Sequence, residues 1–233
     1  MSILELSDYK ENYNRIFDSI EESKKAKVKI ICVSKSHPVE ALVNAYNSGL
    51  KVFGENYVQE MVDKYSTISN EIKKNIEWHF IGHLQTNKVK YIAPFVNFIH
   101  SIDKVKLMKE IDKRAGENNR IINGLVQVNI SNEVSKSGCE IDEAMEIVKQ
   151  SINLQNIKIV GLMAISGLES TDLERKNQFE KLRDLRNKVE TNLEIKLPEL
   201  SMGMTDDYHL AIEAGSTMIR IGTAIFGKRE YIK

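Results

Sequence analysis

The feature that most constrains the fold of this chain is a series of eight short apolar segments that alternate with segments of helical periodicity. Apolar strands separated by helices form a parallel sheet whose outer face the helices cover. Eight such units in 233 residues favour an α/β fold, a closed (β/α)8 TIM-type barrel with an extra N-terminal helix. The predicted strands occupy residues 28–34, 50–54, 76–82, 95–101, 121–130, 157–165, 195–201 and 217–222. The predicted helices occupy residues 5–24, 38–49, 57–68, 103–116, 141–148, 171–189 and 206–214, with a short one from Gln85.

An open, doubly wound sheet is the alternative arrangement of the same elements. Its dinucleotide-binding form has a G-x-G-x-x-G segment after the first strand. Residues 34–38 read SKSHP and contain no glycine, so the sequence favours the barrel. The chain has only three prolines and no linker-like segment, and residues 1–233 are therefore predicted to form one domain.

The charge balance and the apolar pattern exclude several classes of function. Lys and Arg together number 33, as do Asp and Glu, so no net field attracts nucleic acid or an anionic membrane. No apolar run approaches the roughly 20 residues that span a bilayer, and the early acidic residues argue against a signal peptide. Two cysteines, Cys32 and Cys139, imply no disulfide framework, and Cys32 reads as a small buried hydrophobe. We therefore expect a cytoplasmic protein.

Residues at the predicted strand ends indicate where function lies, because barrels of this type place their sites at the carboxyl ends of the strands. The seventh strand ends in SMGMTDD and the eighth in RIGT, so each combines a glycine with a threonine, in the pairs Gly203 with Thr205 and Gly222 with Thr223. Backbone N–H groups, a hydroxyl and a helix N-terminus form a phosphate cradle. Either end alone is better explained by a turn glycine and a helix N-cap. Because two adjacent ends carry the same chemistry, phosphate binding is favoured.

A lysine beside a phosphate cradle predicts a particular type of ligand. Lys35 follows the first strand, which neighbours the eighth in a closed barrel. A molecule with a phosphate at one end and an aldehyde near the other would bridge the two strand ends. Pyridoxal 5′-phosphate (PLP) has both groups, and a lysine holds it as a Schiff base. A lone lysine at a strand end is usually only solvated, so the prediction for Lys35 depends on the phosphate cradle.

Eight segments of the chain, taken together, point to one family. They are VSKSHP, FGENYVQE, WHFIGHLQTNK, SIDK, VNISNEVSKSG, GLMAI, LSMGMTDD and RIGTAIFG, and they extend from residue 33 to residue 227. The chain resembles the pyridoxal phosphate homeostasis proteins, also called the alanine racemase N-terminal-domain-like or YggS/PROSC family. The resemblance implies a PLP-bound barrel like that of fold-type III PLP proteins, with an N-terminal helix and no established catalytic turnover.

The resemblance also implies a set of cofactor-binding residues. Lys35 is then the Schiff-base lysine, Arg220 faces the pyridine nitrogen, and Thr205 binds phosphate where relatives more often have serine. Gly222 and Thr223 also hold phosphate. The remaining residues that the resemblance places in the pocket are Asn56, His79 and Met202. Lys136 is a further lysine that the family shares.

His79 has a second interpretation. It shares one face of its predicted strand with Ile81, whereas Trp78 and Phe80 lie on the other. It could therefore be a barrel-interior histidine that contacts no ligand. No histidine has a cysteine at metal-binding spacing, so no metal site is predicted.

Two functions from different classes fit these observations. In the first, the protein binds PLP reversibly and takes part in intracellular PLP homeostasis, with PLP-dependent apoenzymes as partners and no catalytic residue. In the second, it is a fold-type III PLP enzyme, an amino-acid racemase or decarboxylase. Such enzymes carry a further β domain that completes the active site across a dimer, and this chain ends at Lys233, about where the barrel closes. We therefore expect the binding protein, as a monomer that contacts neither nucleic acid nor membrane.

Overall fold

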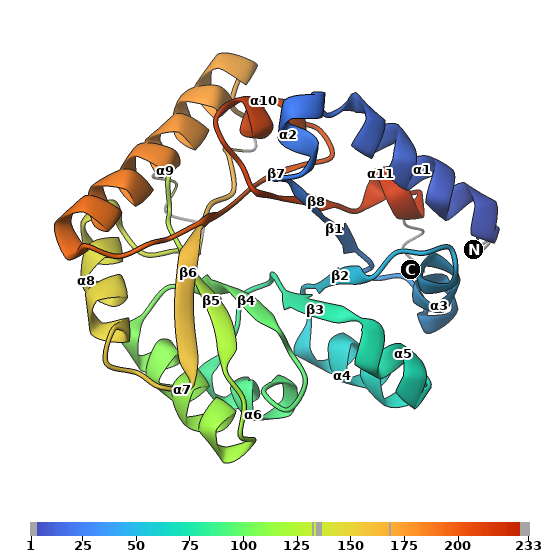
Figure 1. Ribbon diagram of the computed structural model, residues 1–233, viewed down its shortest axis with the longest axis horizontal. Helices are drawn as coiled ribbons and strands as arrows, with labels where there is room; N and C mark the ends of the chain where they lie inside the picture. Colours follow the sequence, from blue (N-terminus) through green and yellow to red (C-terminus); the bar gives the residue numbers. More distant parts are fainter. Residues whose placement is uncertain (1–3, 132, 134–136, 168, 229–233) are drawn as a thin grey trace.

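The computed structural model describes residues 4–131, 133, 137–167 and 169–228. Its centre is a barrel of eight parallel strands that follow one another in chain order, and β8 pairs with β1 to close it (Figure 1). The predicted (β/α)8 barrel is confirmed, and the open sheet is excluded. The strands are β1 (Lys29–Val33), β2 (Val52–Glu55), β3 (Glu77–Phe80), β4 (Phe98–Ile102), β5 (Ile122–Gln127), β6 (Ile157–Met163), β7 (Glu199–Met204) and β8 (Met218–Ile221).

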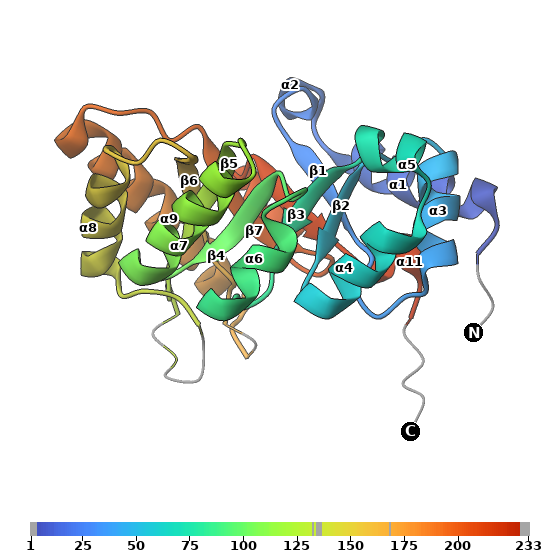
Figure 2. The same ribbon diagram turned by 90° about the horizontal axis from the view of Figure 1, so that it is seen from below.

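The helices surround the barrel, and α2 lies beyond the end at which β1 begins (Figure 2). They are α1 (Leu6–Ser19), α2 (Glu22–Lys25), α3 (Val39–Asn47), α4 (Val58–Thr67), α5 (Asn70–Asn75), the 3₁₀ turn η1 (Thr86–Lys88), α6 (Val89–Ile92), α7 (Val105–Glu117), α8 (Ile141–Ser151), α9 (Asp172–Leu193), α10 (Tyr208–Glu213) and α11 (Thr223–Phe226).

The N-terminal helix ends earlier than the predicted range of 5–24. The Ser19 hydroxyl donates to the Ile16 carbonyl at 2.6 Å, which is the acceptor that the Ile20 N–H would use in a continued helix. The Ile20 N–H bonds to the Phe17 carbonyl instead, and Ile20 is extended at φ −77° and ψ 132°. The predicted single helix is therefore two helices, α1 and α2.

Two other elements differ from the expectation. Strand β7 begins at Glu199 and not near residue 195, because Pro198 has no N–H to contribute to a sheet ladder. Helix α5 was not predicted; Ser69 caps it by accepting a hydrogen bond from the Ile72 N–H. A capping box between Thr171 and Glu174 is present at the start of α9.

Alternation along the strands separates two hydrophobic layers. The outer layer lies between strands and helices and contains Trp78 and Phe80. The inner layer fills the barrel, and its buried members are Ile31, Val33, Ile81, Phe98, Leu125, Val160, Met163 and Met218. The predicted division of β3 into two faces is therefore confirmed.

The extra helix α1 braces the short helix that follows β8. Tyr9 is 1% exposed and packs edge-to-face on Phe226, with ring centroids 5.6 Å apart. The Asn12 side-chain amide donates to the Ile225 carbonyl at 3.1 Å. Helix α1 thus holds α11 in place at the carboxyl end of β8.

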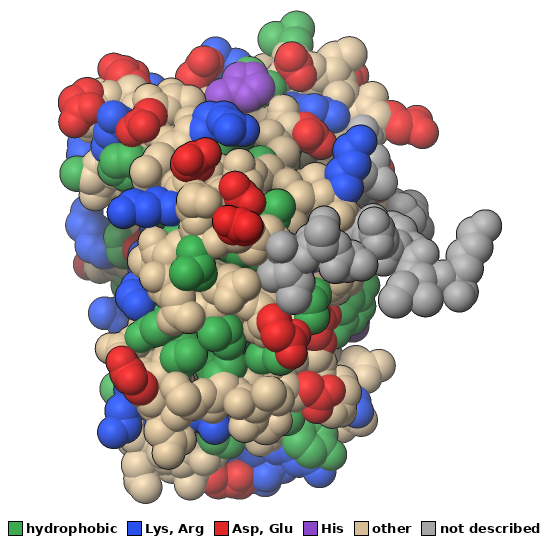
Figure 3. All heavy atoms as spheres, turned by 90° about the vertical axis from the view of Figure 1, so that its right-hand side faces the viewer, with side chains coloured by type: hydrophobic (Ala, Val, Ile, Leu, Met, Phe, Trp, Pro, Cys, Tyr) green, Lys and Arg blue, Asp and Glu red, His purple; other side chains and the backbone are tan. Residues whose placement is uncertain are grey.

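The surface carries charges of both signs. Figure 3 shows Lys and Arg side chains interspersed with Asp and Glu side chains on one face of the molecule. Within the described ranges, every helix is too short or too polar to cross a bilayer.

Candidate functional site

The predicted site residues of β1 and β8 come from neighbouring strands. Ile31 pairs with Arg220, and both face the barrel interior. Val33 is the last residue of β1, and Lys35 follows two residues later, half-buried. The lysine therefore lies at the carboxyl end of the barrel, beside the strand that carries Arg220.

The end of β8 leads directly into a helix N-terminus. Gly222 is the N-cap of α11, and its carbonyl accepts from the N–H groups of Ile225 and Phe226. Thr223, which is exposed, is the first residue of the helix. The first N–H groups of a helix have no acceptor within that helix. Gly222 and Thr223 thus offer backbone donors and a hydroxyl at the barrel mouth.

The last part of β7 has a backbone that only glycine suits. Gly203 has φ +93°, and a Cβ built there would lie 2.6 Å from the Ala211 Cβ. Asp207, 3% exposed, fixes the following turn by accepting from the Met204 N–H and the Ser166 hydroxyl, each at 2.6 Å. Asp207 is the N-cap residue of α10, so the alternative role of Thr205 as the cap of that helix is wrong.

A buried ionic cluster holds the segment around Lys35. The Lys64 ammonium donates to Glu55, Glu60 and the Ser34 carbonyl, each at 2.7 Å. The Ser34 hydroxyl donates to Glu55, and the Ser36 N–H donates to Glu60, both at 2.6 Å. We call these five residues the β1 clamp.

The β1 clamp fixes a strained backbone. Ser36 is one of the few non-glycine residues with positive φ, at +61°. The side chains of Lys64 and Glu55 are 5% and 0% exposed. Burial raises the pKa of Glu55, whereas the charge of Lys64 opposes that rise. Both residues that flank Lys35 are thus tied to β2 and α4.

Arg220 lies inside the barrel and remains charged at neutral pH. Its guanidinium donates to the Ser201 hydroxyl at 2.7 Å and to the Ala164 carbonyl at 3.0 Å. Burial lowers its pKa to about 10, although the charge of Asp207 acts in the opposite direction. Because a guanidinium has only donors, Arg220 can offer a ligand hydrogen bonds but cannot accept one.

The side chain of His79 lies in the barrel interior. Its ring is fully buried and stacks on Phe98 at a centroid distance of 4.5 Å. Both ring nitrogens bond within the protein, to Glu77 at 2.7 Å and to His100 at 2.8 Å. This environment matches the second interpretation, that of an interior histidine.

Several polar atoms at the barrel mouth are buried without a hydrogen-bond partner in the described part of the chain. They lie at or just after the carboxyl ends of β2, β4 and β5, and are Asn56 Oδ1, Ser101 Oγ, Asn129 Oδ1 and Ser131 Oγ. Buried polar groups are almost always paired. The residues present therefore fit a polar ligand that enters the mouth.

The approach of β2 and β3 at the mouth also depends on glycine. A Cβ built on Gly82 would lie 2.0 Å from the Asn56 carbonyl oxygen. Any side chain at residue 82 would push aside the backbone that carries Asn56. Gly82 therefore sets the position of this predicted pocket residue.

One further predicted pocket residue, Met202, has its side chain away from the barrel mouth. The side chain of Met202 is fully buried in the outer hydrophobic layer, between strands and helices. Lys136 lies outside the described residues.

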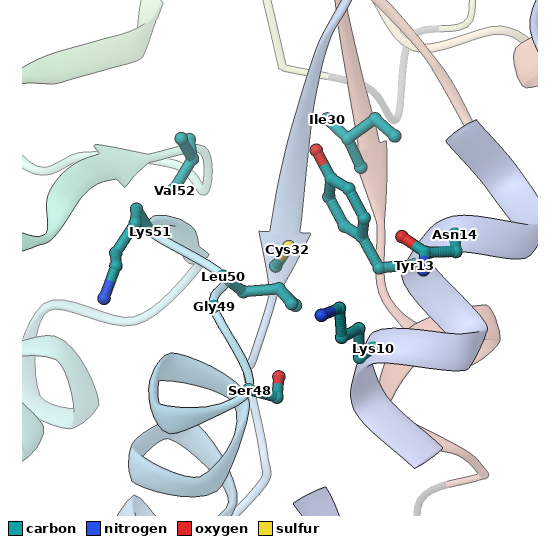
Figure 4. Close-up of a pocket in the computed structure, with 10 residues that line it drawn as sticks. All are labelled: Lys10, Tyr13, Asn14, Ile30, Cys32, Ser48, Gly49, Leu50, Lys51 and Val52. Carbon is teal, nitrogen blue, oxygen red and sulfur yellow. The ribbon is translucent and has the colours of Figure 1, made fainter. Parts of the chain in front are cut away.

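A separate hollow of about 420 Å³ lies between α1, β1 and the segment of residues 48–52 that leads into β2 (Figure 4). Lys10 and Tyr13 extend into it from α1, and Cys32 lies on its floor. None of the predicted cofactor residues lines it. Burial raises the pKa of the Cys32 thiol, which is 1% exposed, as expected for a small buried hydrophobe.

The side chains that support the site were not among the predicted site residues. Glu55, Glu60, Lys64, His100 and Ser201 were not predicted to have a role. A usable signal existed for one pair, because Glu60 and Lys64 are four residues apart on a predicted helix. Their link to Lys35 depends on tertiary contacts.

Comparison with known proteins places this geometry in a family. Residues 4–230 match the family described as alanine racemase, N-terminal domain. The pyridoxal phosphate homeostasis protein of Aquifex aeolicus is 43% identical over 203 residues, which are 87% of this chain and 88% of that protein.

Two solved structures have the same fold. PipY of Synechococcus elongatus with PLP bound is 32% identical, with a TM-score of 0.83 over 94% of this chain and 100% of that chain. Alanine racemase of Clostridium difficile has a TM-score of 0.78 over 99% of this chain and 58% of that chain, and its 13% identity shows the fold alone. On these matches, the chain belongs to the pyridoxal phosphate homeostasis proteins of the alanine racemase N-terminal domain family.

Proposed function

We propose that this protein binds PLP and takes part in intracellular PLP homeostasis, with residues 1–233 as one PLP-binding barrel domain. The observation that carries the proposal is the position of Lys35, at the carboxyl end of β1 beside the helix N-terminus that follows β8. The binding of PLP by PipY and the name of the Aquifex aeolicus relative support it.

In this proposal each mouth residue has one role. Lys35 holds the aldehyde carbon as a Schiff base, formed by condensation with loss of one water. The N–H groups at the start of α11 and the Thr223 hydroxyl bind the phosphate, as does Gly222, with Thr205 on the adjacent turn. Arg220 donates to the ring nitrogen. Asn56 lies beside the ring, whereas His79 supports the pocket from the barrel interior through its bonds to Glu77 and His100. Met202 contributes its backbone because its side chain faces the outer layer.

The bound cofactor would supply an aldehyde and an electron-withdrawing ring. The residues of this chain do not favour use of that ring as an electron sink. Arg220 remains charged at neutral pH and can only donate, so it keeps a facing ring nitrogen unprotonated. We therefore propose a carrier of PLP and not an amino-acid racemase or decarboxylase.

A binding titration tests the proposal. Thr223→Val removes one hydroxyl donor at nearly constant shape, and a hydrogen bond to a charged group is worth about 1.5–3 kcal/mol. PLP should therefore bind about ten- to a hundredfold more weakly. The matched control is Thr191→Val on the exposed face of α9, where the hydroxyl bonds only to the Asn187 carbonyl. Equal affinities in the two variants would place the phosphate elsewhere.

An exchange assay tests the choice between carrier and enzyme. The PLP-loaded protein is incubated in heavy water with alanine and several other amino acids, and deuterium at the α-carbon is measured. A carrier should give no exchange at enzyme-like turnover. Exchange at such a rate that disappears in Lys35→Ala would establish the enzyme instead.

The proposal also includes the cellular location, the oligomeric state and the partners of the protein. A cytoplasmic monomer that hands PLP to apoenzymes, without contact to nucleic acid, agrees with the balanced charges of the sequence and of the face in Figure 3. Light scattering on the purified protein tests the monomer. Transfer of PLP to an apoenzyme, followed by recovery of that enzyme's activity, tests delivery.

A further inference from the structure

A line of hydrogen bonds crosses the barrel interior and ends at Arg220. Glu77 bonds to His79 Nε2 at 2.7 Å, and His79 Nδ1 to His100 Nε2 at 2.8 Å. His100 Nδ1 bonds to the Ser201 hydroxyl at 2.9 Å, which in turn accepts from Arg220 at 2.7 Å. Four strands contribute these side chains. We call the five residues the barrel relay.

The two end residues of the barrel relay fix the direction in which its hydrogen bonds are donated. Arg220 can only donate, so the Ser201 oxygen accepts from it and the Ser201 proton points to His100 Nδ1. His100 must then carry its proton on Nε2 and donate to His79 Nδ1. His79 likewise carries its proton on Nε2 and donates to Glu77, which as a carboxylate only accepts.

The alternative arrangement of protons leaves one hydrogen-bond donor without an acceptor. If His79 were doubly protonated, it would donate to His100 Nε2, and His100 would donate from Nδ1 to the Ser201 oxygen. The Ser201 proton would then have no acceptor, because Arg220 offers none. Burial lowers the pKa of both histidines, which agrees with two neutral rings.

The charged groups around the barrel relay reinforce the same direction. The Lys29 ammonium donates to Glu77 at 2.6 Å from β1 and lies 5.1 Å from the Phe98 ring centroid. Burial acts to raise the pKa of Glu77, but bonds from His79 and Lys29 lower it to about 2. At the other end, Asp207 lies close enough to influence the pKa of Arg220. Glu77 is therefore ionised, and the accepting end is fixed.

We propose that the barrel relay holds Arg220 in one orientation at the barrel mouth, and that His79, His100 and Glu77 are positioning residues for it. The Ser201 and Ala164 contacts use two of the five N–H groups of the guanidinium and direct the rest. The part of the inference that concerns the cofactor rests on the proposed PLP function; the part that concerns proton positions does not.

Nitrogen NMR of the histidine rings tests the proton positions on the full chain without PLP. His79 and His100 should each show a protonated Nε2 and an unprotonated Nδ1 at neutral pH. A ring protonated on Nδ1, or on both nitrogens, would overturn the proposal. This measurement needs no variant and no cofactor, so it decides the barrel relay even if the protein binds no PLP.

A variant pair tests the action on Arg220. Glu77→Gln replaces the obligate acceptor with an amide that can also donate, so the imposed direction is lost. PLP should bind about two- to tenfold more weakly, as expected for one hydrogen bond, and the pH titration of the bound chromophore should shift. Glu199→Gln is the matched control, because Glu199 bonds to the Thr217 hydroxyl at the start of β7, outside the barrel relay.

The two variants separate the possible results. A chromophore titration shifted in Glu77→Gln and unchanged in Glu199→Gln supports the positioning role. Identical affinities and titrations in both would overturn that role while leaving the proposed PLP binding intact. If Glu77→Gln fails to fold, Ser201→Ala replaces it, because it cuts the same line next to Arg220.

Discussion

The β1 clamp and the barrel relay support the same mouth in different ways. In the β1 clamp, an ammonium and two carboxylates are packed together. Lys64 bonds to the backbone before Lys35 and to Glu60, which accepts from the backbone N–H after Lys35. In the barrel relay, two neutral rings separate the charges of Glu77 and Arg220. The β1 clamp therefore depends on charge, and the barrel relay depends on proton direction.

The difference corresponds to what each assembly holds. A lysine that forms a covalent bond needs a fixed backbone, because its side chain must move between free and bound states. An arginine that only donates needs a fixed side chain. Removing a charge should therefore damage the β1 clamp most, whereas a change of protonation should damage the barrel relay.

The largest effect is expected from Lys64→Met. The substitution leaves Glu55, whose side chain is 0% exposed, without its cation, and breaking a buried pair in this way costs about 3–5 kcal/mol. Urea unfolding measures the loss. The control is Lys176→Met, because Lys176 pairs with Glu213 at 3.1 Å on the exposed surface, where such pairs are worth about 0–1 kcal/mol. A similar small loss in both variants would refute the β1 clamp.

A smaller effect is expected from Gly203→Ala, two residues after Ser201 of the barrel relay. An alanine there must adopt φ +93°, at a cost of about 1–3 kcal/mol, and its Cβ would also meet Ala211. Gly215→Ala is the control: φ is +103°, but the nearest atom is Arg183 Cδ at 3.6 Å. Only Gly203→Ala should weaken PLP binding as well. If Gly215→Ala were equally destabilised, the close approach of α10 would be irrelevant.

The smallest effect is a pH dependence that belongs to the barrel relay. Burial lowers the pKa of His79 and His100 from the ordinary value of 6.5. Below pH 6.5 the unfolded chain therefore binds more protons than the folded protein, and the free energy of unfolding decreases as the pH is lowered. Each ring contributes up to about 1.4 kcal/mol per pH unit. Glu55 has a raised pKa, so its contribution to the free energy of unfolding increases as the pH is lowered. Glu77 has a pKa of about 2, so its stabilising contribution is lost only at a pH below this range.

The difference between wild type and His100→Gln isolates this dependence. Unfolding free energies are measured for both proteins between pH 6.5 and pH 5. The wild type should lose more stability than the variant over that range. Parallel curves would mean that the pKa of His100 is the same in the folded protein and in the unfolded chain.

The fold was predictable because its determinants are local. Alternation placed His79 and Ile81 inside the barrel, and the run of apolar strands with helices between them predicted closure. The start of β7 was predicted too early, because a pattern of apolar residues does not show that Pro198 lacks the N–H that a sheet ladder needs.

The mouth was only partly predictable. Strand ends are visible in the sequence, so Lys35 and the two glycine–threonine pairs could be placed. The supporting contacts depend on strand register: His79 meets His100 across 21 residues, and His100 meets Ser201 across 101. In the sequence, nothing distinguishes Lys64 from a solvent-exposed lysine on a helix, and only the folded structure shows that it is buried.

The most direct test of the central claim is the identity of the residue that binds PLP. The protein is loaded with PLP, reduced with borohydride, digested and mapped by mass spectrometry. We expect the pyridoxyl group on Lys35, and loss of the label and of the chromophore in Lys35→Ala. A label on Lys64, Lys88 or Lys136, with Lys35 unmodified, would contradict it.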